Sequence, residues 1–455
     1  MSKPTPLSGF PELLPEQRFV EQQVIATLAH TFELHGFASI ETRAVEPMDQ
    51  LLRKGDTSKE IYLLRRLQED ERQDSAIKAG VGLHYDLTVP FARYVLENAG
   101  KLEFPFRRYQ IQKAWRGERP QEGRFREFTQ ADIDIVGRDV LPFHHDIEVT
   151  RVMLDALSRL ADPKLLGLPA FRLQVNNRKL LQGFYLGIGA PDVDEAMRLV
   201  DKLDKLPEDE VRKLLVAEAG LSEEQADQCL ALARICTADD SFVAEVRALG
   251  VSHELLDEGL DELAALVRGC AGLVTDRVRI EADLKIARGL DYYTGTVFET
   301  RLDGFESLGS ICSGGRYDAL ASDGKTTYPG VGISLGVSRV LVPLFQRGLL
   351  VADRSVPSAV LVALNDEESR EAADLVAGAL RGNGVPCEVA PTPAKFGKQI
   401  RYAERRGIPY VLFTTDSGHE VKDIRTGDQV PADPATWTPS TQDLRPQVTI
   451  KEQNS

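Results

Sequence analysis

The chain has 455 residues, too many for one hydrophobic core, so its length predicts two to four domains. Its composition, 42% hydrophobic and 27% charged, is typical of a soluble globular protein, and no run of residues approaches the ~20 apolar positions of a membrane span. The net charge of −15 excludes a protein that coats nucleic acid with its whole surface, so a nucleic-acid partner would need a local basic patch.

The first predicted elements are a helix over Pro11–Gly36 and a strand over Phe37–Pro47. Apolar residues recur at helical spacing in the first segment, and Gly36 provides a C-terminal stop. Helix-then-strand units are common, so this pattern alone indicates no function.

A carboxylate and a hydroxyl stand close together in the segment YDLTVPFARY, at Asp86 and Thr88. On one side of a short extended stretch before Pro90, this pair suits an ammonium group. Alternatively, the same side chains form a helix N-cap cluster, because Thr88 precedes a helical run from Pro90. The residues alone leave both interpretations open.

Two segments with alternating side chains predict an antiparallel hairpin between Phe104 and Gly137. The apolar side carries Tyr109, Ile111, Trp115, Phe125, Ile133 and Ile135, and the polar side carries Arg108, Gln110, Gln112, Arg116, Arg126, Gln130, Asp132 and Asp134. The loop Gly117–Gly123 can turn one limb back on the other. The hairpin therefore has one apolar face and one face crowded with Arg, Gln and Asp.

The polar face of this hairpin has groups that suit a small charged ligand. Arg116 and Arg126 offer rigid forks of donors for phosphate oxygens. Gln130 and Asp134 are separated by roughly 13 Å, at about 3.3 Å per residue, so they could hold opposite ends of one polar molecule. For an arbitrary hairpin, the simpler interpretation is a solvated sheet face with salt bridges.

Residues 174–277 change character, being mostly helical, rich in Leu, Ala, Glu, Asp and Arg, and without a recognisable motif. We expect an inserted helical domain there. Just before it, the adjacent His144 and His145 lack further ligands at metal spacing, so we expect them on the surface.

The cysteines and the N-terminus indicate a cellular compartment. Five cysteines with no CxxC pair indicate a reducing environment and argue against a disulfide framework or a structural zinc. Residues 1–10 lack the basic-then-apolar order of a signal peptide. We therefore expect a cytoplasmic protein.

Residues 287–295 (ARGLDYYTG) return to strand and loop chemistry. Arg288, beside a glycine, can approach a phosphate closely, and Tyr292 and Tyr293 offer phenolic groups to a ring nitrogen. Two tyrosines in a strand would equally be good sheet packing. Further on, the glycines of Ser313–Asp318 predict a tight turn that enters a helix.

Alternating strands and helices predict a small α/β domain over residues 358–440, after a linker at 350–357 and before a loose polar tail at 441–455. Its predicted helix over 396–406 and the residue before it carry a basic patch of Lys395, Lys398, Arg401, Arg405 and Arg406. A solvated helix face explains this pattern equally well.

The hairpin resembles motif 2 of the class II aminoacyl-tRNA synthetases. Arg116-x-Glu118, a loop and then GRFREF over 123–128 carry this likeness. The continuation FTQADID over 128–134 is similar to the version found in the histidyl-tRNA synthetase family.

Other segments extend the resemblance to essentially the whole chain. RGLDYYTGTVFE over 288–299 resembles the histidyl signature, HGFASIETRAVEP over 35–47 resembles motif 1, and GVGISLGVSRVL over 330–341 resembles motif 3. Ser338 stands where the family often has Glu before the motif 3 arginine, which puts an ion pair there in doubt.

The resemblance implies roles for the matched residues. Arg116 and Arg288 would be catalytic, at the α-phosphate. ATP would be bound by Arg116, by Glu118 at the adenine edge, by Phe128 stacked on adenine, and by Arg339. Histidine would be bound by Asp86, Thr88 and Gln130 at its amino group, Asp134 at its imidazole, Arg116, Arg288, Tyr292 and Tyr293. Transfer RNA would meet Arg119 and Gln121 in the hairpin loop and Lys398 and Arg401 in the C-terminal domain.

The implied fold is α+β, with an antiparallel-sheet catalytic core at residues 1–173 and 278–349, the helical insertion at 174–277, and an α/β anticodon-binding domain at 358–440. The implied activity is ATP-dependent activation of L-histidine to histidyl-adenylate and its transfer to the 3′ end of tRNA-His. We expect a homodimer that uses Mg²⁺ with ATP, contains no zinc and has no membrane partner.

Two alternatives belong to other classes. A regulatory subunit of ATP phosphoribosyltransferase shares the catalytic fold, but generally lacks RGLDYY and the C-terminal domain, and both are present here. A different class II synthetase is disfavoured by the pairs Gln130/Asp134 and Tyr292/Tyr293.

Overall fold

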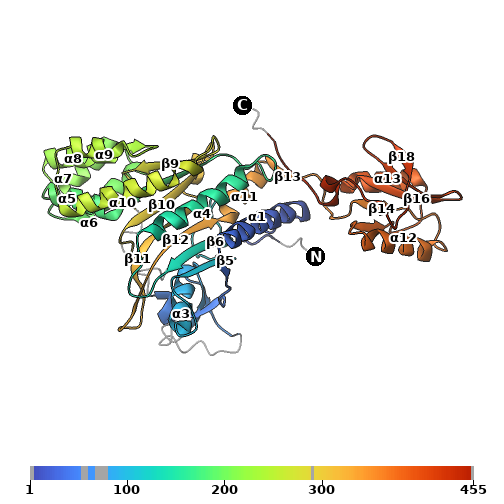
Figure 1. Cartoon of the computed structure of the whole chain (residues 1–455), viewed down its shortest axis with the longest axis horizontal. Coiled ribbons are helices and arrows are strands. Elements are labelled where there is room, and N and C mark those ends of the chain that lie inside the picture. The colour runs from blue at the N-terminus through green and yellow to red at the C-terminus, as the bar shows by residue number, and fades with distance from the viewer. Residues whose placement is uncertain (1–4, 53–59, 67–79, 288–291, 452–455) are drawn as a thin grey trace. The chain divides into compact units, whose positions relative to one another are not determined.

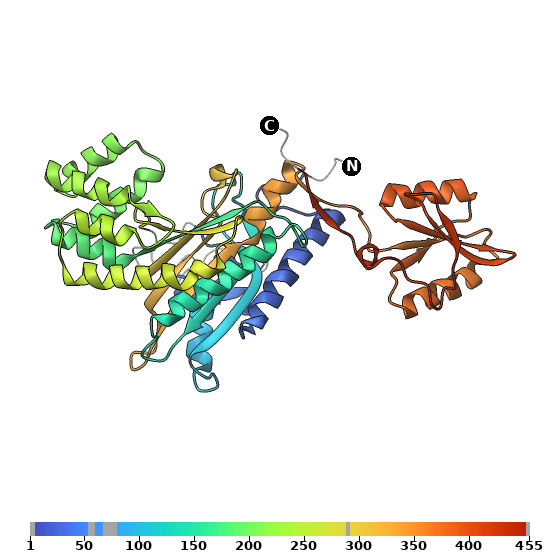
Figure 2. The same ribbon diagram turned by 45° about the horizontal axis from the view of Figure 1, so that its top comes forward.

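The computed structural model describes residues 5–52, 60–66, 80–287 and 292–451 (Figures 1 and 2). The chain forms two compact units, one of Met1–Pro11 with Val24–Pro343 and one of Glu12–Gln23 with Leu344–Ser455. Among the described helices, none is long and apolar enough to cross a membrane.

A nine-stranded sheet organises the larger unit, in the order β1-β5-β6-β12-β11-β10-β7-β9-β8. Its strands are β1 (Ala38–Ser39), β5 (Phe106–Trp115), β6 (Glu127–Val136), β7 (Phe171–Asn177), β8 (Cys236–Thr237), β9 (Val278–Asp283), β10 (Thr296–Leu302), β11 (Cys312–Ser322) and β12 (Thr327–Gly336). β1 pairs parallel with β5 and β7 with β9, and the other neighbours pair antiparallel. The mostly antiparallel sheet confirms the expected α+β class.

The predicted hairpin is formed by β5 and β6, which pair from Phe106 opposite Val136 to Trp115 opposite Glu127. Its polar face is buried, because the Arg108 guanidinium lies 4.2 Å from the centre of the Phe91 ring on α3 (Thr88–Asn98). Likewise Gln110 is fully buried and donates to the Thr42 hydroxyl at 2.9 Å. A solvated sheet face is therefore excluded at these positions.

Helices pack along this sheet. α4 (His144–Ala161) runs against β6, β12, β7 and β9, and α3 packs on β11 (Figure 1). The remaining elements of the core are α1 (Pro15–Leu34), α2 (Met48–Leu51), η5 (Glu306–Leu308), α11 (Val337–Gln346) and a small sheet of β2 (Val45–Pro47), β4 (Val81–Leu83) and β3 (Leu63–Leu64).

The insertion is helical, as the sequence predicts. Its elements are α5 (Arg178–Gly187), α6 (Val193–Val200), η3 (Asp201–Asp204), α7 (Glu208–Ala217), α8 (Glu223–Ala233), α9 (Phe242–Ala248), α10 (Glu254–Cys270) and η4 (Ala271–Leu273). The backbones of α5 and α10 touch, because a Cβ at Gly183 would lie 2.1 Å from Leu256 N and one at Gly259 would lie 2.2 Å from Leu180 N. Glycine is required at both positions for this contact.

The smaller unit contains a five-stranded sheet in the order β15-β14-β16-β17-β18. Its elements are β14 (Val360–Val362), α12 (Arg370–Gly382), β15 (Cys387–Val389), α13 (Phe396–Arg406), β16 (Tyr410–Thr415), β17 (Gly418–Asp423) and β18 (Gln429–Pro431). Within the expected loose tail, η6 (Thr441–Leu444) leads to β19 (Val448–Ile450), which pairs with β13 (Leu350–Ala352), so the described part of that segment contains regular structure.

Two local expectations are wrong. Residues 313–318 form part of β11 and not a turn entering a helix, because the glycines serve close strand packing: a Cβ at Gly314 would lie 2.1 Å from Gly332 O. His145 is buried, and its Nδ1 lies 2.7 Å from Glu148 Oε2 in the first turns of α4, while His144 is exposed as expected.

Candidate active site

Three adjoining cavities form one cleft over β6, β10, β11 and β12. The arginine cavity, of about 250 Å³, is lined by Arg116, Glu118, Arg124, Phe128, Gln130 and Arg339 among others. The inner cavity, of about 30 Å³, is lined by residues that include Thr88, Asp132, Asp134, Tyr292, Tyr293 and Tyr317. The outer cavity, of about 680 Å³, joins them, because it shares Arg116, Arg124 and Arg339 with the first and Tyr292 and Tyr293 with the second.

The arginine cavity gathers three guanidinium groups, two from the hairpin and one from α11 (Val337–Gln346). Arg116 follows β5, and its Nε donates to Tyr85 O at 3.0 Å while its guanidinium lies 5.1 Å from the centre of the Phe128 ring. Arg339 is in the first turn of α11 and donates to Leu308 O. Arg124, in the hairpin loop, completes the group.

The charges of these groups repel one another. Burial, and then the neighbouring Arg124 and Arg116, lower the pKa of Arg339 to about 10. Glu118 offsets the repulsion among the arginines only in part. Its carboxylate lies 3.4 Å from Arg124 Nη1 and 4.0 Å from Arg116 Nη1. An anion in this cavity would relieve the repulsion, which makes the cavity suited to phosphate oxygens.

Asp134 is fixed in the inner cavity by a buried ion pair. Its Oδ2 lies 2.5 Å from Nη2 of the fully buried Arg108, one strand away on β5, and its Oδ1 accepts from the Tyr317 hydroxyl at 2.9 Å. The backbone beside it must be glycine, because a Cβ at Gly332 would lie 2.0 Å from Asp134 Oδ1. This carboxylate is therefore held in one orientation.

The rings of Tyr292 and Tyr293 have their centres 4.1 Å apart and are tilted by 51° to each other, and both residues line the inner and the outer cavity. Burial, followed by the influence of Tyr292 and Asp134, raises the pKa of Tyr293 well above its ordinary value. The phenol is therefore a neutral hydrogen-bonding group at neutral pH.

Gln130 bridges the two ends of the cleft. It lines the arginine cavity, its Nε2 donates to the Ser334 hydroxyl, and Ser334 also lines the inner cavity. Its buried Oε1 has no hydrogen-bond partner among the described residues. A buried acceptor in that situation suits a donor from a ligand.

The two interpretations of Asp86 and Thr88 separate in the structure. Asp86 Oδ1 accepts from Val89 N at 3.0 Å at the start of α3, as in the N-cap alternative, and Asp86 lines none of the three cavities. Thr88 does line the inner cavity together with Asp132, a residue for which no role was predicted. Its place on the polar side of the hairpin was the signal that could have identified it.

The other expected residues have varied positions. Ser338 replaces an ion pair with a hydrogen bond, since its hydroxyl accepts from Thr129 N at 2.8 Å and so joins α11 to β6. Gln121 lines the outer cavity, Arg119 is exposed on the hairpin loop, and Lys398 and Arg401 are exposed on α13 of the smaller unit. Arg288 lies outside the described residues.

Other residues of the cleft escaped the sequence analysis. Arg108, Arg124 and Tyr317 had no assigned role, because only the fold brings them beside Asp134 or Arg339. Among the described residues there is no cluster of three or more His, Cys, Asp or Glu side chains that could hold a metal ion.

Comparisons with known proteins agree with this geometry. The family model for histidyl-tRNA synthetase matches residues 9–340, and that for the anticodon binding domain matches residues 358–433. A histidine–tRNA ligase of Cutibacterium acnes is 59% identical over 454 residues, covering 98% of this chain and 99% of its own length. The histidine–tRNA ligase of Micrococcus luteus is 57% identical, with the same coverage.

Solved structures give the same picture. Histidyl-tRNA synthetase from Nostoc sp. PCC 7120 superposes with a TM-score of 0.81 at 32% identity, over 94% of this chain and 96% of that one. An ATP phosphoribosyltransferase regulatory subunit/histidyl-tRNA synthetase from Bacillus halodurans C superposes at 0.70, but its 20% identity over 88% of this chain and 97% of that one shows the fold alone. The chain therefore belongs to the histidyl-tRNA synthetase family, the ligases that activate histidine with ATP and charge tRNA-His.

Proposed function

We propose that the arginine cavity holds the α-phosphate and adenine of ATP while the inner cavity holds the side chain of histidine. The observation that supports this most strongly is that Arg116 and Arg339 line one cavity, which joins the tyrosine and carboxylate cavity through shared walls. A histidine bound across the two would have its carboxylate next to the arginines.

In the first step, an oxygen of the histidine carboxylate attacks the α-phosphorus of ATP. A bond forms between that oxygen and phosphorus, and the bond from phosphorus to the bridging oxygen breaks, so that pyrophosphate leaves. Arg116 stabilises the charge that grows on the phosphate oxygens, together with Arg288, which the resemblance assigns to the same task. Both residues act by position and charge, without proton transfer.

The adenine would lie against Phe128, with its edge at Glu118 and with Arg339 at the phosphates. Phe128 lies under the Arg116 guanidinium, so a base stacked on the ring would bring its phosphates to that arginine. The lowered pKa of Arg339 supports its role, because a bound phosphate would offset the repulsion that lowers it.

Histidine selection would depend on Asp134 and Tyr293, with Tyr292 as a wall. A buried carboxylate and a neutral phenol could pair with the two imidazole nitrogens, and such a site rejects analogues that lack those nitrogens by roughly 10⁴ or more. The ammonium group would be held by Gln130 Oε1 and Thr88. The resemblance of residues 85–94 to the family motif adds Asp86, which would have to leave its bond to Val89 N to reach the ligand.

Mg²⁺ would enter the site with ATP, bound to phosphate oxygens of the nucleotide. Such an ion needs only one or two protein carboxylates besides phosphate oxygens, so the lack of a three-residue cluster in the described part of the chain is compatible with it. Glu299 on β10, which is buried and lines the outer cavity with Arg339, would hold it. The ion would neutralise charge on the departing pyrophosphate. We propose no zinc.

In the second step, a terminal ribose hydroxyl of tRNA-His attacks the carbonyl carbon of the adenylate and AMP leaves. Arg119 and Gln121 would meet the acceptor end, and Lys398 and Arg401 on α13 would bind the anticodon region.

We also propose a homodimer through the motif 1 segment at residues 35–47, in the cytoplasm, without a membrane partner. Sedimentation of the purified protein tests the dimer.

The test of the activity is amino-acid-dependent ATP–pyrophosphate exchange over the twenty amino acids. We expect exchange with histidine only, and a large loss of exchange in Arg339→Met, with little change in the matched control Arg138→Met, whose side chain lines none of the three cavities. A regulatory subunit would give no exchange with any amino acid, and another synthetase would respond to a different one.

A further inference from the structure

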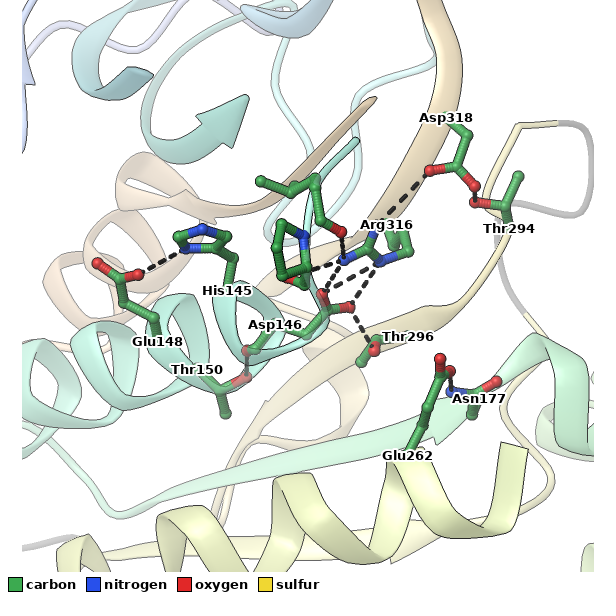
Figure 3. A network of polar contacts seen from close by, with 12 residues as sticks. His145, Asp146, Glu148, Thr150, Asn177, Glu262, Thr294, Thr296, Arg316 and Asp318 are labelled. Carbon is green, nitrogen blue, oxygen red and sulfur yellow. Dashed lines mark hydrogen bonds and ion pairs between the residues drawn. The ribbon is translucent and has the colours of Figure 1, made fainter. Parts of the chain in front are cut away.

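Figure 3 shows a row of polar side chains that runs from α4 to Thr294. None of them lines any of the three cavities. The row consists of Asp146 in the first turn of α4, Arg316 and Asp318 on β11, and Thr294, which directly follows Tyr293 in the chain. We call these four residues the Arg316 network.

The buried half of the Arg316 network is an ion pair. Arg316 Nη2 donates to Asp146 Oδ2 at 2.6 Å and to Leu141 O at 3.0 Å, and Asp146 Oδ1 accepts from the Thr296 hydroxyl at 2.7 Å. Asp146 is fully buried and Arg316 nearly so. Loss of either partner would leave a buried charge uncompensated. The ion pair with Asp146 therefore holds the Arg316 side chain in one position in the core.

The exposed half of the Arg316 network joins Arg316 to Thr294. The Thr294 hydroxyl donates to Asp318 Oδ2 at 2.6 Å, and Asp318 Oδ1 lies 3.6 Å from Arg316 Nη1. In addition, Thr294 N donates to Arg316 O at 2.9 Å. Both the side chain and the backbone of Thr294 are therefore attached to β11.

Two glycines bring the tyrosine segment into close contact with β11. A Cβ at Gly295 would lie 2.9 Å from Arg316 Cδ, and one at Gly315 would lie 2.7 Å from Cδ1 of Tyr293. The Arg316 side chain thus crosses Gly295, and the Tyr293 ring rests on the β11 backbone. A shift of Thr294 would therefore move the ring that lines the inner cavity.

We propose that the Arg316 network positions Tyr292 and Tyr293 for histidine, with Asp146 anchoring Arg316 and Asp318 holding the segment through Thr294. This inference rests on the proposed role of the two tyrosines in binding histidine. The four residues are positioning residues, since none of them lines the cleft. The Arg316 network forms hydrogen bonds to the tyrosine segment and not to Arg116 or Arg339. We therefore expect it to affect the binding of histidine and not the binding of ATP.

The test uses the exposed half, where substitution does not threaten folding. Thr294→Val keeps the shape of the side chain and removes its hydroxyl, whereas Thr294→Ser keeps the hydroxyl. In pyrophosphate exchange we expect Thr294→Val to raise the KM for histidine about fivefold to tenfold, as loss of an ordinary hydrogen bond of about 1 kcal/mol does, with the KM for ATP within about twofold. Thr294→Ser should restore the histidine KM. Asp318→Ala should match Thr294→Val, and the double variant should add nothing further.

The chain offers a matched control in its other unit. The Thr426 hydroxyl donates to Asp428 Oδ2 at 2.7 Å in the turn between β17 and β18, so Thr426→Val removes the same kind of exposed bond. It should leave both KM values unchanged. An unchanged histidine KM in Thr294→Val, an equal rise in the ATP KM, or failure of Thr294→Ser to restore the constant would overturn the proposal.

A parallel variant separates this inference from the proposed function. If Tyr293→Phe leaves the histidine KM unchanged, the role of the tyrosines is wrong and the network has nothing to position. If Tyr293→Phe raises it but Thr294→Val does not, the role of the tyrosines stands and the Arg316 network alone is refuted.

Discussion

The substitution Asp134→Asn tests the centre of the proposed histidine site, and the structure predicts two separate effects. Asp134 is 4% exposed and its Oδ2 lies 2.5 Å from the fully buried Arg108, so loss of its charge leaves that arginine uncompensated. Breaking a buried ion pair in this way costs about 3–5 kcal/mol of folding free energy. The substitution also replaces a charged acceptor for the imidazole with a neutral amide oxygen, which should separately lower kcat/KM for histidine by roughly 10–10².

The two effects separate in the double variant Arg108→Met/Asp134→Asn. Methionine removes the buried charge and keeps an unbranched side chain against the Phe91 ring, so most of the lost stability should return. Histidine-dependent pyrophosphate exchange should stay low, while the KM for ATP should remain within about threefold of wild type, since no ATP contact changes. The assays are thermal unfolding and pyrophosphate exchange, with histidine varied at saturating ATP and ATP varied at saturating histidine. If the double variant regains both stability and exchange, Asp134 is a structural residue and the assignment is refuted.

Three further predictions follow from particular contacts. Gly332→Ala should abolish histidine-dependent exchange in a folded protein, because its Cβ would lie 2.0 Å from Asp134 Oδ1 and displace the carboxylate; normal exchange would contradict that geometry. Lys398→Glu with Arg401→Glu should lower tRNA charging at least tenfold but leave pyrophosphate exchange unchanged, as both side chains are exposed on α13. Burial lowers the pKa of His145, so the unfolded state binds the proton better and stability should fall as the pH drops below about 6.5. His145→Gln should weaken that pH dependence of urea unfolding, and an unchanged slope would show that other groups cause it.

Local patterns predicted the hairpin well, because the alternation of β5 and β6 reflects the two faces of a strand and needs no knowledge of distant residues. They failed for Ser313–Asp318, where consecutive glycines are typical of a turn. In the fold, Gly314 and Gly315 lie where β11 passes close to β12 and to the Tyr293 ring, and this requirement comes from other segments. His145 was misplaced for a similar reason, since its partner Glu148 and the buried start of α4 are features of the folded chain.

The candidate site residues also fall into two groups: those that a sequence motif indicates and those that only the fold places in the cleft. Arg116, Gln130, Asp134 and Arg339 could be proposed from the sequence because they belong to extended motifs, and the structure places all four in the lining of the cleft. Asp132 belongs to one of these motifs, FTQADID, but the motif assigned it no role, and it became a candidate only when the fold placed it with Thr88 in the lining of the inner cavity. The polar residues that a sequence does not identify as site residues are therefore those whose partners lie on another strand or helix.

The pairing of Arg108 with Asp134 is better explained by function than by stability. A buried ion pair is often no more stable than well-packed apolar residues of the same volume, so folding alone gives little reason to retain one under α3. A lone carboxylate in that cavity would have a raised pKa and would lose its charge. Arg108 opposes this effect and, with the Tyr317 hydroxyl, fixes the orientation of the carboxylate. The proposed site thereby has a carboxylate paired with an arginine beside the phenols of Tyr293 and Tyr317, and that combination would distinguish an imidazole from an apolar ring of similar size.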